Sequence, residues 1–473
     1  MIIAREEELR RLHEAAESEY SQFIAVYGRR RIGKTFLIRE AFNYHFTFEH
    51  AGLAHQDKEA ELAAFCNSLA GHGLEVGEAK PQNWLDAFEL LKKLIRESGD
   101  TKKVIFIDEL SWMDTPGSDL VAALEAFWNG WASARKDVVL IVCASATSWM
   151  MDEIIHNKGG LYNRLNLQIG LKPFTLKECE EYLQAMNIVM SRQDILEGYM
   201  VFGGVPFYWS LLRKDLSLAQ NIDALFFAES APLKNEFSYL YASLFDNPTK
   251  YIEVITALGK KKIGMTRQEI AQTTSLFNSG ILTGVLEDLE NCGFIRGYTE
   301  FGKKKKGEVF QLIDNFTLFH FKFLETPPTD EHFWVNTLNT PGRNSWCGLA
   351  FERVCLEHVP QIKQKLGISG VLTETHSWQC KEDPDKGVNG SQIDLLIVRQ
   401  DRVINVCEAK YSSLDYTITK AYDMKLREKI HDFQTVTRTR NTIHLTLITT
   451  YGLKQNAYSG SIQSVVTAED LFA

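Results

Sequence analysis

The sequence FIAVYGRRRIGKTFLIREAF, residues 23–42, decides the fold of the N-terminal part of the chain. Its middle section, GRRRIGKT, fits the pattern G-x-x-x-x-G-K-[ST] from Gly28 to Thr35. The apolar run FIAVY before it is typical of a buried strand, and FLIREAF after it has the spacing of a helix. A loop of this pattern between a strand and a helix predicts a phosphate-binding P-loop on a parallel sheet.

The loop supplies the groups that hold a nucleoside triphosphate. Backbone N–H groups at a helix N-terminus wrap the phosphates, Lys34 bridges the β and γ phosphates, and the Thr35 hydroxyl binds Mg²⁺. We therefore predict ATP and Mg²⁺ as cofactors. The predicted nucleotide-binding residues of the loop are Gly28, Arg29, Arg30, Arg31, Ile32, Gly33, Lys34 and Thr35.

Two more apolar runs, residues 104–107 and 138–142, end in polar side chains. The first is followed by Asp108 and Glu109, which we assign to the metal and to the base that activates water. The second leads to Ser145, with Thr147 just beyond, and a hydroxyl there would orient the attacking water beside the nucleotide. The sequence leaves open which of the two acts, or whether either is only a turn residue.

Composition limits the class of protein. A chain of 473 residues is too long for one core, so we expect two to four domains. The eight cysteines are spaced singly, which suggests neither disulfides nor a zinc site. No apolar run approaches the roughly 18 residues of a membrane span, so we expect a cytoplasmic protein without membrane contact. The net charge of −9 argues against general polyanion binding but leaves a local groove for nucleic acid possible.

The pattern changes along the chain and predicts an α/β multidomain protein. Strands alternate with helices at first, as in a parallel sheet, and a helical stretch follows. Helices and two strands around a glycine-lysine turn then have the order of a winged helix, before a second α/β region. The predicted domains are a P-loop ATPase core at 1–175, a helical lid at 176–245, a winged helix-turn-helix at 246–325 and a C-terminal α/β domain at 326–473.

Several motifs resemble those of the archaeal-type ATPases, a group of AAA+-like and STAND-type proteins. The group's LYxR motif is matched by Leu161, Tyr162 and Arg164, and its PF-x-L-x-E motif by Pro173, Phe174, Leu176 and Glu178. Its Gly-Gly-x-Pro turn is matched by Gly203, Gly204 and Pro206. The resemblance implies that Arg164 is an arginine finger toward a neighbouring subunit of a homo-oligomer, and that Pro206 belongs to a nucleotide-sensing turn. Arg164 also fits a surface ion pair.

The winged-helix segment gives a mixed signal for DNA. Residues 303–306 are four lysines at the predicted wing tip, which suits phosphate contact. The expected recognition helix, SGILTGVLEDLENCG at 279–293, carries three acids and no Arg or Lys to read bases. Sequence-specific reading is therefore not expected. A DNA clamp and a purely structural or dimerising domain both remain open.

The C-terminal sequence QIDLLIVRQDRVINVCEAK, residues 392–410, predicts a hairpin symmetric about residue 401. Residues whose numbers sum to 802 then lie opposite each other, so Asp394 faces Glu408. Strand alternation puts Lys410 on the same face as Glu408. Opposed carboxylates repel each other but suit a divalent cation, so we predict a metal site at Asp394 and Glu408 with Lys410 beside it.

This arrangement resembles the PD-(D/E)xK nuclease motif, with Asp394 followed by Glu408-x-Lys410, and Glu352 in GLAFERVCLEHV matches the family's acid on the first helix. The resemblance implies a restriction-endonuclease-like domain that uses Mg²⁺, or Mn²⁺ in its place. An accidental hairpin with a surface ion pair is the alternative. A polar insert at 381–391 departs from the family pattern and would form a loop facing the substrate.

Together these features predict an ATP-hydrolysing protein whose nucleotide state controls a metal-dependent nuclease acting on DNA. Defence against phage or mobile DNA is a natural setting for that combination. The alternative is a non-catalytic, ATP-dependent switch whose C-terminal domain only binds nucleic acid or a partner. Intact acids at 394 and 408 with Lys410 favour the enzyme.

Overall fold

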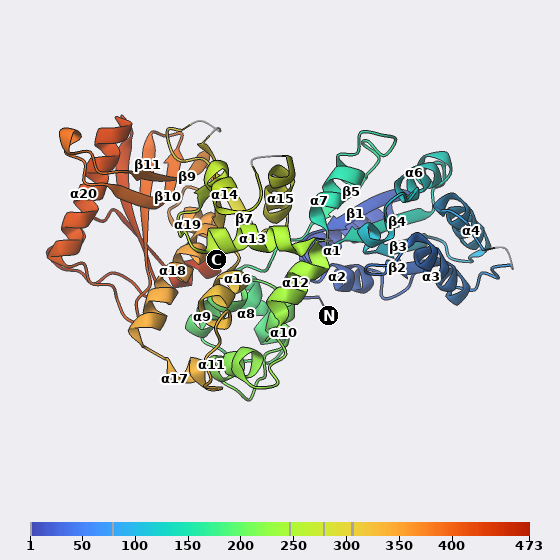
Figure 1. Ribbon diagram of the computed structural model, residues 1–473, viewed down its shortest axis with the longest axis horizontal. Helices are drawn as coiled ribbons and strands as arrows, with labels where there is room; N and C mark the ends of the chain where they lie inside the picture. Colours follow the sequence, from blue (N-terminus) through green and yellow to red (C-terminus); the bar gives the residue numbers. More distant parts are fainter. Residues whose placement is uncertain (1, 78–79, 246, 278–279, 304–306) are drawn as a thin grey trace. The chain divides into compact units, whose positions relative to one another are not determined.

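A computed structural model of the protein describes residues 2–77, 80–245, 247–277, 280–303 and 307–473 (Figure 1). The chain divides into two compact units. The first contains residues 1–173 and 239–248, and the second contains residues 174–238 and 249–473. In the parts of the chain that the structure describes, no helix is both long and apolar enough to cross a membrane.

The first unit is built on a parallel five-stranded sheet of order β2-β3-β4-β1-β5. The three strands predicted around the P-loop are confirmed as β1 (Gln22–Tyr27), β3 (Lys103–Asp108) and β4 (Val138–Ala144). Because β4 lies between β1 and β3, the carboxyl ends of all three meet at one edge of the sheet. The other elements are β2 (Phe48–Ala51), β5 (Leu167–Gly170), α1 (Glu6–Glu17), α2 (Lys34–Ala41), α3 (Lys58–Gly71), α4 (Trp84–Glu97), α5 (Leu110–Met113), α6 (Leu120–Gly130), η1 (Ala132–Ala134), α7 (Thr147–Trp149) and η2 (Met150–Ile155).

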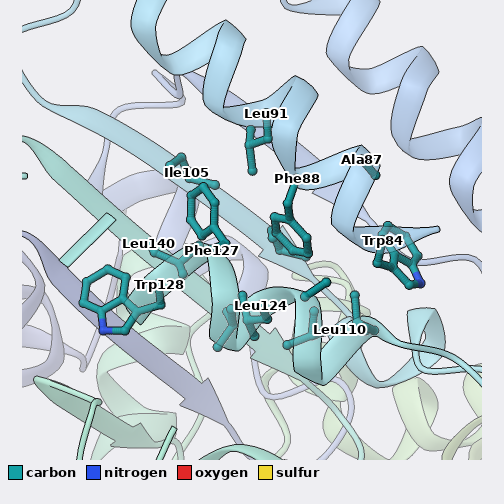
Figure 2. Packing of buried hydrophobic residues seen from close by; sticks show 14 of the residues in the cluster. Trp84, Ala87, Phe88, Leu91, Ile105, Leu110, Leu124, Phe127, Trp128 and Leu140 are labelled. Atoms are coloured by element: carbon teal, nitrogen blue, oxygen red, sulfur yellow. The ribbon is translucent and has the colours of Figure 1, made fainter. Parts of the chain in front are cut away.

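Helices cover both faces of this sheet because its central strands are apolar on both sides. Side chains on one face of the sheet, such as Ile24 and Phe106, pack against α1 and α2. Side chains on the opposite face, such as Ile105 and Leu140, pack against α3, α4 and α6. Figure 2 shows Phe88 of α4 and Phe127 of α6 within this second cluster, with ring centroids 5.2 Å apart. The sheet edge that carries the P-loop is thus held from both sides.

Glu61 is a fully buried acid of this unit. Glu61 of α3 is 0% exposed, and burial raises its pKa to about 7. One carboxylate oxygen accepts a hydrogen bond from the Leu53 N–H at 2.8 Å, and the other has no hydrogen-bond partner among the described residues. The folded state therefore favours the protonated acid, whose unfolded pKa is near 4.5.

Replacing this acid should stabilise the unit in a pH-dependent way. The raised pKa costs nothing below about pH 4.5, and the cost grows as pH rises toward 7, reaching on the order of 3 kcal/mol. Glu61→Gln should therefore raise the melting temperature at pH 8 by about 5 °C, with the gain disappearing at pH 4.5. Scanning calorimetry across pH measures this, with Glu59→Gln on the same helix as an exposed control. A gain independent of pH would contradict the account.

The second unit begins with the helical stretch predicted at 176–245. Helical structure runs through most of this region, as the sequence predicts. Three of the four predicted domains therefore have most of their residues in one compact unit, separated from the first unit at Pro173. The elements are α8 (Leu176–Ala185), α9 (Arg192–Phe202), α10 (Pro206–Ser210), α11 (Leu218–Ile222), η3 (Asp223–Phe227) and α12 (Glu236–Leu244).

The segment predicted to be a winged helix has the expected order of elements. Helices α13 (Pro248–Gly259), α14 (Arg267–Thr273) and α15 (Gly280–Asn291) accompany an antiparallel sheet of order β6-β8-β7. The strands are β6 (Met265–Thr266), β7 (Ile295–Tyr298) and β8 (Val309–Leu312). Of the four wing-tip lysines, those at 304–306 lie outside the described residues, and Lys303 forms an ion pair with Glu300.

The C-terminal region contains a mixed sheet of order β13-β12-β11-β10-β9. The predicted hairpin is confirmed as β10 (Ser391–Arg399) and β11 (Val403–Lys410), and β12 (Thr442–Thr449) pairs with β11 in parallel. Helix α20 (Lys420–Thr437) packs Leu426 and Phe433 onto the sheet. The remaining elements are α16 (Asn315–Phe319), η5 (His320–Leu324), α17 (Phe333–Asn336), α18 (Pro341–Glu357), α19 (Val359–Lys365), β9 (Thr373–Cys380), η6 (Pro384–Lys386), η7 (Ser459–Ser461), β13 (Ser464–Thr467) and η8 (Ala468–Phe472).

Candidate functional site

The P-loop has the backbone that a phosphate cradle requires. Gly28 has φ +140°, and a Cβ there would lie 2.5 Å from the Leu171 carbonyl oxygen and 2.7 Å from Ile32 Cδ1. Gly33 has φ +89° and is the N-cap of α2, so the next residue, Lys34, begins the helix. Glycine is needed at both positions for backbone reasons. The N–H groups at the start of α2 are thereby left for an anion.

Lys34 is folded back onto its own loop. Its ammonium group donates to the carbonyl oxygens of Gly28, at 2.8 Å, and Arg29, at 3.1 Å, and to Ser145 Oγ at 3.0 Å. The side chain is only 5% exposed. A buried ammonium with neutral partners only is well suited to accept the charge of a triphosphate.

The three loop arginines differ in their surroundings. Arg29 is buried, and Arg31 adopts φ +72°. Arg30 places its guanidinium 5.9 Å from the centre of the Trp112 ring. These positions describe the loop and do not by themselves assign a phosphate contact to any of the three side chains.

The predicted magnesium ligands are in direct contact. Thr35 Oγ1 donates to Asp108 Oδ2 at 2.6 Å, and the other oxygen of Asp108 accepts from the Glu109 N–H at 2.9 Å. A hydroxyl and a carboxylate at the sheet edge form a hard oxygen donor set, which fits Mg²⁺. Thr35 and Asp108 are therefore the residues that would hold the ion.

Glu109 is held by the neighbouring strand. It follows β3 with φ +47°, an uncommon conformation for a side chain of this size. Its carboxylate accepts from Ser145 Oγ at 2.6 Å and from the Ser145 N–H at 3.0 Å. Ser145 thus links the predicted base to Lys34. The Thr147 hydroxyl is also buried but has no hydrogen-bond partner among the described residues, so the geometry favours Ser145 of the two candidates.

Arg164 lies at the surface of the first unit. Among the residues that the structure describes, its guanidinium has no ion-pair or hydrogen-bond partner. The alternative of a surface ion pair within the chain is therefore not observed. A free guanidinium is compatible with a partner on another subunit.

The two motifs after the first unit pack against each other. A Cβ on Gly204 would lie 1.8 Å from the Phe174 carbonyl oxygen, and the Phe174 N–H donates to the Gly204 carbonyl at 2.6 Å. Glu178 closes a capping box with Thr175 at the start of α8. Pro206 is the first residue of α10. It belongs to the second unit, so its proposed role toward nucleotide stays a prediction.

The observed pairing of β10 with β11 agrees with the prediction that opposed residues of the hairpin have numbers that sum to 802. The observed pairs, Leu395 with Cys407 through Val398 with Ile404, all sum to 802. Asp394 and Glu408 are the next residues outward from the first of these pairs. The predicted register of the two strands is therefore confirmed, while the metal site remains a prediction.

Glu408 is surrounded by donors. One oxygen lies 3.0 Å from Lys410 Nζ and accepts from the Tyr422 hydroxyl at 2.8 Å, and the other accepts from Lys429 Nζ at 2.6 Å. Burial alone would raise the pKa of Glu408, but the two ammonium groups outweigh burial and lower it to about 2. The carboxylate is thus ionised throughout the neutral range.

The other two predicted acids share a different cation. Lys262 Nζ lies 2.6 Å from Glu352 Oε2 and 3.6 Å from Asp394 Oδ2. Burial, followed by the charge of Asp394, raises the pKa of Glu352, and Lys262 opposes that rise. Glu352 and Asp394 are therefore close neighbours. Asp394 and Glu408, which the hairpin argument paired around one metal, instead interact with separate lysines.

Within the described ranges, no three His, Cys, Asp or Glu side chains are grouped closely enough to hold a metal ion. Glu352 and Asp394 still fit a divalent cation chemically, since two oxygen ligands already share one positive charge. Sequence reasoning missed Lys262, Tyr422 and Lys429. No strand or helix periodicity relates them to the acids, because Tyr422 and Lys429 lie 14 and 21 residues from Glu408 on another element, and Lys262 precedes Glu352 and Asp394 in a different predicted domain.

The predicted lid is bonded to the elements that carry these acids. Glu197 of α9 accepts from the Tyr411 hydroxyl at 2.8 Å and from Arg343 Nη2 at 3.2 Å. Tyr411 directly follows Lys410, and Arg343 lies on α18 with Glu352. His358, just after α18, accepts from the Leu176 N–H of α8 at 3.1 Å. Helices α8 and α9 are thus hydrogen-bonded to α18, to His358 after it and to the residue that follows Lys410.

Comparison with known proteins supports the reading of the N-terminal part. Residues 2–212 match the family model described as an ATPase domain predominantly from Archaea. This match identifies the segment as an ATPase domain of the archaeal type. Such a domain implies a bound nucleotide, usually with Mg²⁺.

Similar proteins match over much of the chain. An uncharacterized protein of Methanocaldococcus jannaschii is 24% identical over 453 residues, covering 91% of this chain and 92% of its own. A Walker-type ATPase of Pyrococcus abyssi superposes with a TM-score of 0.46 at 16% identity, covering 67% of this chain and 95% of its own. The ORC2 protein of Aeropyrum pernix gives 0.38 at 14% identity, with 76% and 95% covered.

Proposed function

We propose that this chain is an ATPase whose nucleotide state controls a metal-dependent nuclease site in its C-terminal region, with DNA as the substrate. The ATPase half is supported by the match at 2–212 and by the contacts among Lys34, Thr35, Asp108, Glu109 and Ser145. In this proposal Glu109 accepts a proton from the attacking water, and Ser145 sets its orientation.

The observation that carries nucleotide control is the bonding of α9 to the acidic site. Glu197 connects α9 to Tyr411, beside Lys410, and to Arg343 on the helix of Glu352. A switch needs two conformations. In this proposal they would differ in the position of α9, which would change when nucleotide binds.

At the acidic site, Glu352 and Asp394 would hold the divalent cation, and Glu408 would stay with its own lysines on the neighbouring strand. The bound ion would polarise the phosphodiester and supply an activated water. Lys410 is proposed to stabilise the charge that develops on the phosphate. Lys429 and Tyr422 keep the Glu408 carboxylate ionised and oriented.

Assembly and biological setting are further parts of the proposal. Arg164, exposed and without a partner in the described chain, would act on the nucleotide of a second copy. Light scattering with and without ATP tests this, and equal self-association and ATPase rates in Arg164→Ala and the parent would argue against it.

Defence against phage or mobile DNA is the proposed setting, and phage plating on cells expressing the parent or Asp394→Asn would check it.

A cleavage assay tests the central claim. Purified protein is incubated with supercoiled DNA, linear DNA and RNA, with Mg²⁺ or Mn²⁺, and with no nucleotide, ADP, ATP or a non-hydrolysable analogue. We expect metal-dependent cleavage of DNA whose rate changes with the nucleotide. Glu197→Gln should weaken the nucleotide dependence while leaving ATP hydrolysis in place. If the cleavage rate were the same with and without nucleotide, the proposed control of the nuclease site by nucleotide would be wrong.

A second candidate is a non-catalytic, ATP-dependent switch that binds nucleic acid or a partner. The observation that favours it is that all three acids already have lysine partners, namely Lys262, Lys410 and Lys429. An ion-pair network of this kind can serve structure alone. Absence of cleavage under every condition above, with ATP-dependent nucleic-acid binding retained, would select this candidate.

A further inference from the structure

Lys262 reaches the acidic site from outside the C-terminal region. It lies between α13 and β6, about 90 residues before Glu352 in the sequence. Its ammonium contacts Glu352 of α18 and Asp394 of β10, two acids that come from different elements. One lysine from the predicted winged helix thus bridges Glu352 and Asp394, the two acids that share a cation.

The position of Lys262 is fixed through its backbone. Its carbonyl oxygen accepts from Arg353 Nη2 at 2.6 Å and from Gln311 Nε2 at 2.8 Å. Arg353 directly follows Glu352 on α18, and Gln311 lies on β8, and both side chains are buried. The loop is therefore anchored from both sides, with its ammonium directed at the acids. A mobile surface lysine would show neither anchor.

The positive charge of Lys262 offsets the repulsion between two carboxylates, as a bound metal ion would. Two nearby carboxylates in a partly buried site require a cation, and a divalent ion supplies twice the charge of an ammonium. Both would occupy the same carboxylate oxygens. The Lys262 side chain is 36% exposed, compared with 29% for Lys410 and 20% for Lys429, so its ammonium has the most open route to solvent of these three lysines.

We propose that Lys262 closes the acidic site to divalent cations in the resting chain, and that metal binds when this lysine withdraws from Glu352 and Asp394. The inference rests on the proposed nuclease site and adds its regulation. Withdrawal would follow movement of the loop at 260–264 relative to α18. That relative movement would break the hydrogen bond from Arg353 of α18 to the Lys262 carbonyl.

Direct measurement of Mn²⁺ binding tests the proposal without relying on cleavage. Nucleotide-free, full-length parent, Lys262→Met and Lys262→Gln are titrated with Mn²⁺ by calorimetry. We expect both variants to bind at least about tenfold more tightly than the parent, because an ammonium no longer competes. Lys262→Arg should keep the weak affinity of the parent. Adding Asp394→Asn to Lys262→Met should remove the gain and so assign it to this site.

Lys261→Met is the matched control. It makes the same change of charge in the same loop, but Lys261 pairs with the exposed Glu269 at 2.6 Å. Its Mn²⁺ affinity should equal that of the parent. Equal affinity in the parent and both Lys262 variants, or an equal gain in Lys261→Met, would overturn the inference.

The two proposals fail in distinguishable ways. If Lys262→Met binds Mn²⁺ more tightly but neither it nor the parent cuts nucleic acid, Lys262 does compete with the metal and the proposed nuclease function is wrong. If the parent cuts DNA while the Lys262 variants bind Mn²⁺ no better, the nuclease stands and the block falls. A melting temperature measured in chelator and in Mn²⁺ gives a second reading, because Lys262→Met should gain more stability from the ion than the parent does.

Discussion

Glu109→Gln should leave ATP binding close to that of the parent while lowering the rate of hydrolysis by about 100-fold or more. The amide keeps the size of the side chain and can still accept from Ser145, but it cannot take a proton from water. Lys34→Ala should instead abolish tight ATP binding, because it removes the ammonium that contacts the loop carbonyls of Gly28 and Arg29 and would bind the phosphates. Fluorescent nucleotide titration and phosphate release separate the two effects.

Ser145 and Thr147 provide a matched pair for the same assay. Ser145→Ala removes the hydroxyl that links Glu109 to Lys34, so hydrolysis should fall much more than binding. Thr147→Val removes a hydroxyl without a hydrogen-bond partner in the described chain and should change hydrolysis little. Equal loss of binding in Lys34→Ala and Glu109→Gln would refute the assignment of roles. A larger hydrolysis defect in Thr147→Val than in Ser145→Ala would reverse the choice of hydroxyl.

Asp394→Asn and Lys410→Ala should each stop nucleic-acid cleavage, lowering the rate by about 1,000-fold or more. Asp394→Asn removes a charge that the metal needs, so Mn²⁺ binding should fall with activity. Lys410→Ala should keep metal binding, because its proposed role is toward the phosphate. Gel assays and Mn²⁺ titration measure the two properties, and Asp401→Asn at the exposed hairpin turn is the control.

The structure changes the expected stability of these variants. The sequence suggests that Asp394 and Glu408 repel each other, so that Asp394→Asn would leave the fold as stable as before or slightly more stable. Asp394 instead lies near Lys262 and Glu352, so the amide loses an attraction and a repulsion together. We expect a nearly unchanged melting temperature and unchanged ATP binding. A large loss of stability in Asp394→Asn, with no cleavage by the parent, would make the acids structural.

Much of the fold could be predicted because its signals are local. The P-loop pattern, the strand before it and the acids after 104–107 lie in short segments whose backbone preferences and apolar spacing suffice. The hairpin register followed from symmetry about residue 401. Strand β9 was not predicted, since TETHSWQC lacks an apolar alternation and Trp378 is its one large side chain in the core.

The sequence by itself determined the phosphate loop and the hairpin that carries Asp394 and Glu408, and it predicted which residues would bind the metal and activate water. It could not determine which cation each acid meets, because ion pairs between distant residues depend on how the elements pack and carry no periodic signal. Only the tertiary structure brought Lys262 to Glu352 and Asp394, and Lys429 to Glu408. It also joined α9 to Tyr411 through Glu197, which local spacing cannot encode, since that contact spans more than 200 residues.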